Sequence, residues 1–192
     1  KRRRRYSSFQ GDLEPLVPNL LKRNFKAEKP REKWVTDITE FKIPAGKAYL
    51  SAVVDCYDGY VVGWSIGKNP TSELANSSLR MAVATLGSEK PYLHSDRGIH
   101  YFWPGWLELV HKYGLKRSMS KKGCTPDNAA CEGFFGRLKN ECFYNRSFLD
   151  ISLTQFMAYI ADYIRWYNQD RIKISLNNLS PLDYRRTMGF AS

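Results

Sequence analysis

The fold is decided by residues 34–66, which read WVTDITEFKIPAGKAYLSAVVDCYDGYVVGWSI. Three runs in this stretch, residues 34–43, 48–55 and 60–66, are rich in the β-branched and aromatic side chains that favour strands. Short segments that contain glycine separate the runs, as turns between strands require. The stretch therefore predicts three antiparallel strands in a meander.

Helices and strands alternate after the meander. Residues 71–86 carry apolar side chains at helical spacing, and Thr71 or Ser72 is a suitable N-cap. Five further elements are expected: strands at 92–95 and 115–118, and helices at 103–113, 126–142 and 153–167. The helix from 126 has Thr125 as its expected N-cap and Pro126 at its first position. This order implies an α/β fold with a mixed five-stranded sheet, three antiparallel strands followed by two parallel ones, flanked by helices.

Composition divides the chain in two. Residues 1–33 begin with KRRRR and contain three prolines, whereas residues 34–192 carry the periodic patterns of a folded core with a C-terminal helical tail. Two interpretations of residues 1–33 stay open. They form either a solvated linker with a short helical turn or a basic arm that lies on DNA phosphate.

The charge balance narrows the class of partner. The 192 residues include 30 Lys and Arg against 19 Asp and Glu, a formal net charge of +11. Such an excess favours nucleic acid or an anionic membrane surface as a partner. No stretch approaches the roughly 20 apolar residues that span a bilayer, so we expect a soluble intracellular protein. The four cysteines form no CxxC pair and have no histidine at zinc-finger spacing, so we expect reduced thiols.

Three acids are candidates for a metal site in this basic chain. Asp37 falls inside the first expected strand, Asp96 lies just past the fourth, and 35 residues separate Asp96 from Glu132 on a helix. The carboxylates can converge if that helix packs beside the first and fourth strands. Carboxylate oxygens suit Mg²⁺ or Mn²⁺, and two such ions support in-line displacement at phosphorus. Asp37 would bridge both ions, although any one of these acids taken alone is more often a solvated charge or a cap.

The helix that bears Glu132 carries further candidates. Asn128, Glu132, Gly136 and Lys139 share one face. The expected apolar side consists of Cys131, Phe134, Phe135, Leu138 and Cys142. Gly133 and Gly136 each cost about 1 kcal/mol relative to Ala in mid-helix. Close approach of DNA or tight packing of the helix on the sheet would account for them.

Other polar residues have candidate roles of two kinds. Arg97, Lys121 and Lys122 are expected to contact DNA, together with Asn128 and Lys139. Asp55 and Asp58 are expected to form turns, and His94 is expected to be a packed strand residue.

Several motifs together resemble the catalytic core of retroviral-integrase-like transposases, in particular the OrfB-type product of bacterial insertion sequence family three. The motifs are WVTDIT at 34–39, HSDRG at 94–98, the segment 118–141 that contains DNAACEGFF, and YNQDR with LSPLDY within 167–184. The resemblance covers about residues 18–184.

This resemblance implies an RNase H-like fold, a catalytic carboxylate triad of Asp37, Asp96 and Glu132, and two Mg²⁺ or Mn²⁺ ions. It also implies that Lys139 touches the transposon end. The helix-turn-helix region of the family is expected to precede residue 1, so the chain is expected to be a catalytic fragment. The implied partners are transposon-end DNA, target DNA and further copies of the chain on DNA, with no membrane and no small-molecule substrate. The implied location is the bacterial cytoplasm, in association with the nucleoid.

The expected function is therefore metal-dependent DNA strand cleavage and strand transfer at insertion-sequence ends, that is, DNA integration and recombination in transposition. Two alternatives stay open. An RNase H-type nuclease is less favoured because of the loop and tail motifs. A catalytically silent DNA-binding or assembly module is less favoured because all three acids are present.

Overall fold

The computed structural model describes residues 17–121 and 129–190, and within them a five-stranded sheet has the order β3-β2-β1-β4-β5. The strands are β1 (Lys33–Ile43), β2 (Gly46–Asp55), β3 (Val61–Gly67), β4 (Tyr92–Ser95) and β5 (Lys116–Met119). β1, β2 and β3 pair antiparallel, whereas β4 pairs parallel with both β1 and β5. The mixed sheet expected from the sequence is confirmed.

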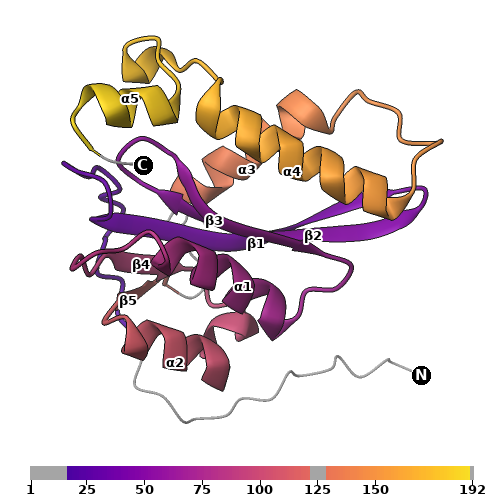
Figure 1. The fold of residues 1–192 in the computed structure, drawn as a ribbon. Coiled ribbons are helices and arrows are strands. Elements are labelled where there is room, and N and C mark those ends of the chain that lie inside the picture. Colours follow the sequence, from indigo (N-terminus) through magenta and orange to yellow (C-terminus); the bar gives the residue numbers. More distant parts are fainter. Residues whose placement is uncertain (1–16, 122–128, 191–192) are drawn as a thin grey trace, which may run out of the picture.

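Helices cover both faces of this sheet (Figure 1). They are α1 (Ser72–Val83), α2 (Pro104–Lys112), α3 (Ala129–Cys142), α4 (Leu153–Gln169) and α5 (Pro181–Thr187). α1 and α2 lie on one face, and α3 and α4 lie on the other. Successive side chains of β1 alternate between the two cores, since Trp34 joins the core with α1 and α2, while Val35 and Phe41 join the core with α3 and α4.

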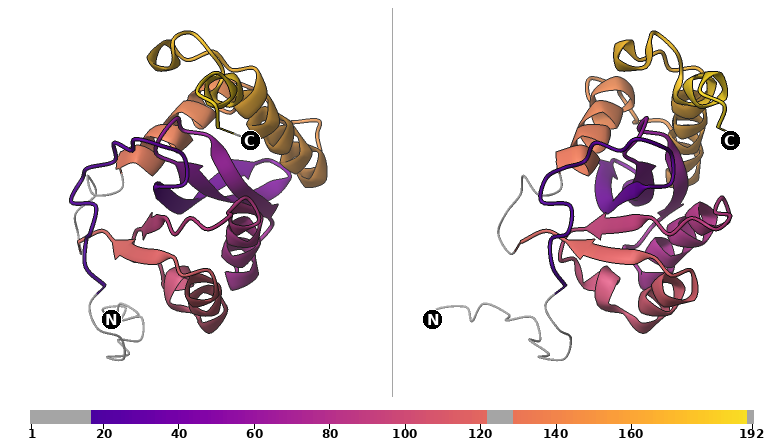
Figure 2. Two further views of the ribbon diagram at one scale, coloured as in Figure 1. Left: turned by 60° about the vertical axis from the view of Figure 1, so that its left-hand side comes forward. Right: turned by 90° about the vertical axis from the view of Figure 1, so that its left-hand side faces the viewer.

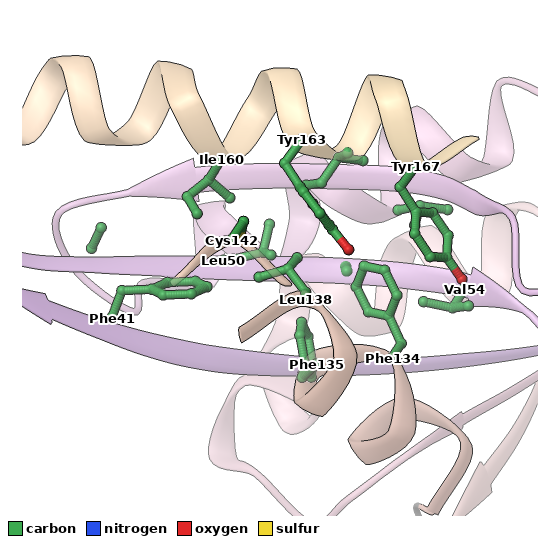
Figure 3. Packing of buried hydrophobic residues seen from close by; sticks show 14 of the residues in the cluster. Phe41, Leu50, Val54, Phe134, Phe135, Leu138, Cys142, Ile160, Tyr163 and Tyr167 are labelled. Atoms are coloured by element: carbon green, nitrogen blue, oxygen red, sulfur yellow. The ribbon is translucent and has the colours of Figure 1, made fainter. Parts of the chain in front are cut away.

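The apolar side of α3 packs against the sheet and α4 (Figure 3). The buried residues of α3 are Cys131, Phe134, Phe135, Leu138 and Cys142, the set predicted from the spacing. α4 begins with a capping box, in which the Ser152 hydroxyl accepts from the Gln155 N–H and the Gln155 side chain accepts from the Ser152 N–H. Two helices thus bury one face of the β1–β3 meander.

Most helices and strands begin and end close to the residues predicted from the sequence. Thr71 is the N-cap of α1, and its hydroxyl accepts from the Leu74 N–H. The expected start of the helix at 126, with Thr125 as its cap, lies outside the described residues. α5 was not expected, although Ser180 caps it and Pro181 occupies its first turn.

The segment from residue 17 to β1 runs beside β5 and α3 (Figure 2). The Met119 N–H donates to the Pro18 carbonyl over 3.2 Å, and the Leu20 N–H donates to Ser118 Oγ over 2.9 Å. Leu21 is buried. The described part of residues 1–33 therefore lies against the outer strand of the sheet, and whether it also contacts DNA stays a prediction.

The turn after β2 is tied to the C-terminal helix. The Tyr57 N–H donates to Asp55 and the Tyr60 N–H donates to Asp58, so both acids form turns as predicted. Both are also buried and bind Arg185 of α5, with 2.5 Å between Arg185 Nε and Asp58 Oδ2 and 3.0 Å between Arg185 Nη2 and Asp55 Oδ2. The local sequence around the turn gave no sign of this partner.

Candidate active site

The parallel pairing of β1 with β4 brings two of the candidate acids together. Their ladder ends with the pair Thr36 and Ser95. Asp37 and Asp96 are the next residue of each chain segment, so they lie at neighbouring positions where the ladder ends. This is the strand-end position at which sites of open α/β sheets form.

The side-chain alternation of β1 directs Asp37 toward α3. Asp37 has the same parity along β1 as Val35 and Phe41, which pack in the core that contains α3. Glu132 lies in the first turn of α3 and is exposed, directly after the buried Cys131. Glu132 therefore lies on the helix that packs over β1, the strand that carries Asp37.

The electrostatics of Asp37 link the three acids. Burial of its carboxyl, then the negative charges of Asp96 and Glu132, raise the pKa of Asp37 from 3.8 to about 7. The Ile38 N–H opposes this shift by donating to Asp37 Oδ1 over 2.7 Å. The same three acids help to raise the pKa of the Cys131 thiol, although burial is the main cause. The negative charges of Asp96 and Glu132 therefore reach the Asp37 carboxyl.

The donors suit a hard divalent ion, because all three are carboxylates. Within residues 17–121 and 129–190, however, no three Asp, Glu, His or Cys side chains lie close enough together to hold an ion. The sequence predicts Asp37, Asp96 and Glu132 as ligands. The acids would have to move closer together before all three could bind one ion.

A loop and two buried hydroxyls surround Asp96. The Gly98 N–H donates to Asp96 Oδ1 over 2.8 Å, and a Cβ on Gly98 would stand only 2.9 Å from that oxygen. Nearby, Tyr101 Oη and Thr36 Oγ1 are both buried. Burial, then the charges of Asp37 and Asp96, raise the pKa of Tyr101, and a hydrogen bond with the Thr36 side chain opposes this shift. Tyr101 was not predicted as a site residue, whereas Thr36 and Gly98 lie within the WVTDIT and HSDRG motifs.

Of the five expected DNA contacts, three lie among the described residues. Lys139 Nζ stands 5.4 Å from the centre of the Phe41 ring, and partial burial lowers its pKa while Glu40 opposes the shift. Lys139 therefore lies beside β1, on the same helix as Glu132. Lys121 is exposed shortly after β5. Arg97 is partly buried and donates to two backbone carbonyls.

The two other expected contacts, Lys122 and Asn128, lie outside the described residues. The DNA contacts of all five residues stay predictions.

The mid-helix glycines of α3 face open space. Among the described residues, a Cβ built on Gly133 or Gly136 would meet no atom within 4 Å. Tight packing of the helix on the sheet is therefore the wrong explanation for them. Close approach of DNA to this face stays a prediction.

His94 is a packed strand residue, as predicted. Its side chain is fully buried. Its Nδ1 lies 2.8 Å from Ser118 Oγ, and its Nε2 lies 3.2 Å from Ser120 Oγ. These bonds hold β4 to β5 and to the residue that follows it, close to Asp96.

The sheet order, the helices on both faces and the acids at adjacent strand ends define an RNase H-like core of the integrase type. The chain belongs to the integrase core domain family, among the IS3-type transposases. Two family profiles described as integrase core domain match residues 27–124 and residues 132–188.

The chain is similar to three bacterial proteins whose names describe a transposase or a transposase-like protein. The chain is 55% identical over 192 residues to the probable transposase for insertion sequence element IS1353 of Shigella flexneri. It is 41% identical over 181 residues to a transposase-like protein of Haemophilus influenzae, covering 94% of this chain and 83% of that protein. It is 35% identical over 163 residues to transposase InsF for insertion sequence IS3A of Escherichia coli, covering 83% of this chain and 57% of that protein. The match to the Shigella protein covers all of this chain but only 37% of that protein.

Solved structures agree on the fold. The HTLV-2 integrase catalytic core domain in complex with magnesium matches with a TM-score of 0.60 and 25% identity, over 77% of this chain and 93% of that one. A chain of the simian T-cell lymphotropic virus intasome matches with a TM-score of 0.66 and 21% identity, over 77% of this chain and 52% of that one. Among the described residues, no helix is both long and apolar enough to cross a membrane.

Proposed function

We propose that this chain is the catalytic core of a transposase that cuts and joins DNA strands at the ends of an insertion sequence. The observation that carries the proposal is the parallel pairing of β1 with β4, which places Asp37 and Asp96 at neighbouring strand ends, with Glu132 close enough to help raise the pKa of Asp37. Neighbouring carboxylates in a chain of net charge +11 suit a cation that meets a polyanion. Membership of the integrase core domain family supports the same conclusion.

The proposed cofactor is a pair of Mg²⁺ or Mn²⁺ ions held by Asp37, Asp96 and Glu132. The carboxylate donors fit these ions. Burial first, and then repulsion by Asp96 and Glu132, raise the pKa of Asp37, and divalent cations would relieve the repulsion. The HTLV-2 integrase core was solved in complex with magnesium. When bound, the ions would activate the attacking oxygen and stabilise the leaving oxygen at phosphorus.

The protein residues position the reactants. Asp37 must lose its proton before it can act as a ligand, and Asp96 is oriented by the Gly98 N–H. Water first attacks a phosphodiester at the end of the element, and the 3′ oxygen of the strand leaves. The freed 3′-hydroxyl then attacks a phosphodiester of another strand. Lys139, on the same helix as Glu132, is placed to neutralise a phosphate near that acid.

The proposed partners are transposon-end DNA, target DNA and further copies of the chain, which would pair two ends. Related cores support assembly, because the HTLV-2 core was solved in dimeric and trimeric forms and the simian viral protein in an intasome. The proposed location is the bacterial cytoplasm, on the nucleoid.

The test uses labelled duplexes that end in the terminal sequence of the element, with Mg²⁺ or Mn²⁺. Asp96→Asn and Glu132→Gln should each abolish cleavage and strand transfer, while Asp150→Asn, at an exposed site, should leave both intact. Full activity in either triad variant would sink the assignment. Preferential cutting of an RNA–DNA hybrid would favour the nuclease. DNA binding with a steep salt dependence but no metal-dependent cleavage would favour the binding module.

A further inference from the structure

A cavity of about 640 Å³ opens between the segment that precedes β1 and the end of β5. The described residues of its lining are Val17, Pro18, Asn19, Lys22, Arg23, Arg97 and Lys121. Four of these seven residues are basic. A concave surface with this charge concentrates anions.

The wall formed by residues 17–23 is held in place by the sheet. The Leu20 N–H donates to Ser118 Oγ, and this hydroxyl is in turn bonded to the buried His94. The Pro18 carbonyl accepts from the Met119 N–H. Contacts with the sheet therefore fix the wall before any ligand arrives.

The backbone of this wall is unusual at its two basic residues. Lys22 and Arg23 have φ angles of 47° and 67°, both in the left-handed region. Each such residue costs on the order of 1 kcal/mol when it is not glycine. The Lys22 N–H donates to Asn19 Oδ1 over 2.8 Å and so closes the turn. The turn places two long cations at the cavity, where glycine or asparagine would form the same turn with less strain.

Arg97 lines the cavity and lies next to Asp96, one of the three candidate metal ligands Asp37, Asp96 and Glu132. Its Nε donates to the Ser120 carbonyl over 2.9 Å and its Nη2 donates to the Val17 carbonyl over 3.3 Å. Arg97 also directly follows Asp96 in the chain. One loop therefore contributes both an acid of the candidate site and a cation of the cavity lining.

We propose that this cavity binds the phosphate backbone of DNA, and that Lys22 and Arg23 supply the contacts. The proposal rests on the proposed function for its choice of DNA. The four basic side chains of the described lining suit phosphate, because Lys and Arg contact mainly the nucleic-acid backbone. The segment before β1 is then part of the DNA interface.

The test is the salt dependence of duplex binding in EDTA. Lys22→Gln with Arg23→Gln should lower the slope of log K against log salt by about 2, since each lost phosphate contact removes about 0.9. The matched control is Lys26→Gln with Lys29→Gln, two exposed cations of the same segment that do not line the cavity, and its slope should stay that of the wild type. Equal slopes for all three proteins would overturn the proposal. Thermal unfolding verifies that both double variants fold.

A second measurement locates the contact. Single phosphates of the duplex are neutralised in turn as methylphosphonates. In the wild type, one or two adjacent positions should weaken binding, and in the Lys22→Gln, Arg23→Gln variant that loss should disappear at those positions. A loss that is the same in both proteins at every position contradicts a local site. Pyrophosphate that competes as well as DNA at equal ionic strength would instead indicate a pocket for small anions.

Failure of this inference and failure of the proposed function are distinguishable. Binding in EDTA does not require cleavage, so the two properties are measured independently. If the loss of binding caused by methylphosphonates depends on Lys22 and Arg23 but no strand is cleaved, the proposed enzymatic function is refuted and the proposed phosphate site stands. If cleavage is normal and the loss of binding does not depend on these residues, the proposed phosphate site is refuted and the proposed enzymatic function stands.

Discussion

Replacing Asp37 by Asn should make the stability of the metal-free protein less dependent on pH. The native state holds the Asp37 proton with a pKa of about 7, whereas the unfolded chain holds it with a pKa near 3.8. The native state therefore binds more protons across this range, and the free energy of unfolding falls as pH rises from about 4 to about 7. Above pH 7 the loss levels off, because the carboxyl is then ionised in both states.

The two pKa values set the size of the effect. One unit of pKa difference corresponds to about 1.4 kcal/mol. Relative to low pH, where both states hold the proton, this group therefore lowers the free energy of unfolding by about 2 kcal/mol at pH 5 and by about 4 kcal/mol at pH 8. The wild type thus loses about 2 to 3 kcal/mol from this group between these pH values. The amide that replaces the carboxyl in Asp37→Asn cannot ionise. The difference in unfolding free energy between this variant and the wild type should therefore shift by that amount in favour of the variant.

Urea unfolding in EDTA, followed by tryptophan fluorescence at about pH 5, 6, 7 and 8, measures this difference. Asp150→Asn is the control, because Asp150 is exposed, and its difference from the wild type should stay constant. A constant difference for Asp37→Asn would refute the argument that burial and like charges raise the pKa. Addition of Mg²⁺ at about pH 8 should stabilise the wild type and leave Asp37→Asn unchanged.

Further substitutions test the fold and the face of α3. Gly136→Ala should raise the unfolding free energy by about 1 kcal/mol, since its Cβ meets nothing, and should slow strand cleavage if DNA lies against it. Gly63→Ala should destabilise instead, because its Cβ would collide with the Ser78 carbonyl, and equal melting temperatures for the two variants would contradict this contrast. Arg185→Met should cost about 3 to 5 kcal/mol in urea unfolding by stranding two buried carboxylates, and a loss no larger than that of an exposed arginine would refute their pairing. Ser152→Ala should cost about 1 kcal/mol, measured by thermal unfolding, and no change would mean that the cap contributes nothing.

Local patterns predicted most of the fold. The strand at residues 34–43, the Thr71 cap and the five buried residues of α3 all follow from patterns that span a few residues. The short α5 was missed because seven residues carry little periodicity, although Ser180 and Pro181 were a readable start signal. Short-range patterns show which face of a helix or strand is apolar.

The features that the sequence did not predict depend on residues that are far apart in the chain. The neighbourhood of Asp37 and Asp96 follows from the register of β1 with β4, which no local pattern contains. Arg185 lies 127 residues from Asp58, so the turn residues gave no hint of an ion pair. The residues near Lys22 looked like a linker because their anchor, Ser118, belongs to β5.

The ion pairs between Arg185 and the turn after β2 also bear on synthesis of the protein. A ribosome delivers Asp55 and Asp58 long before it delivers Arg185, so the growing chain holds two carboxylates without the cation that pairs them in the native core. Burial of unpaired charges is costly, so this end of the meander cannot close until α5 has emerged. A nascent chain arrested before α5 would therefore stay incompletely folded around β2 and β3. Synthesis of α5 then becomes the event that permits this end of the proposed DNA-cutting core to form.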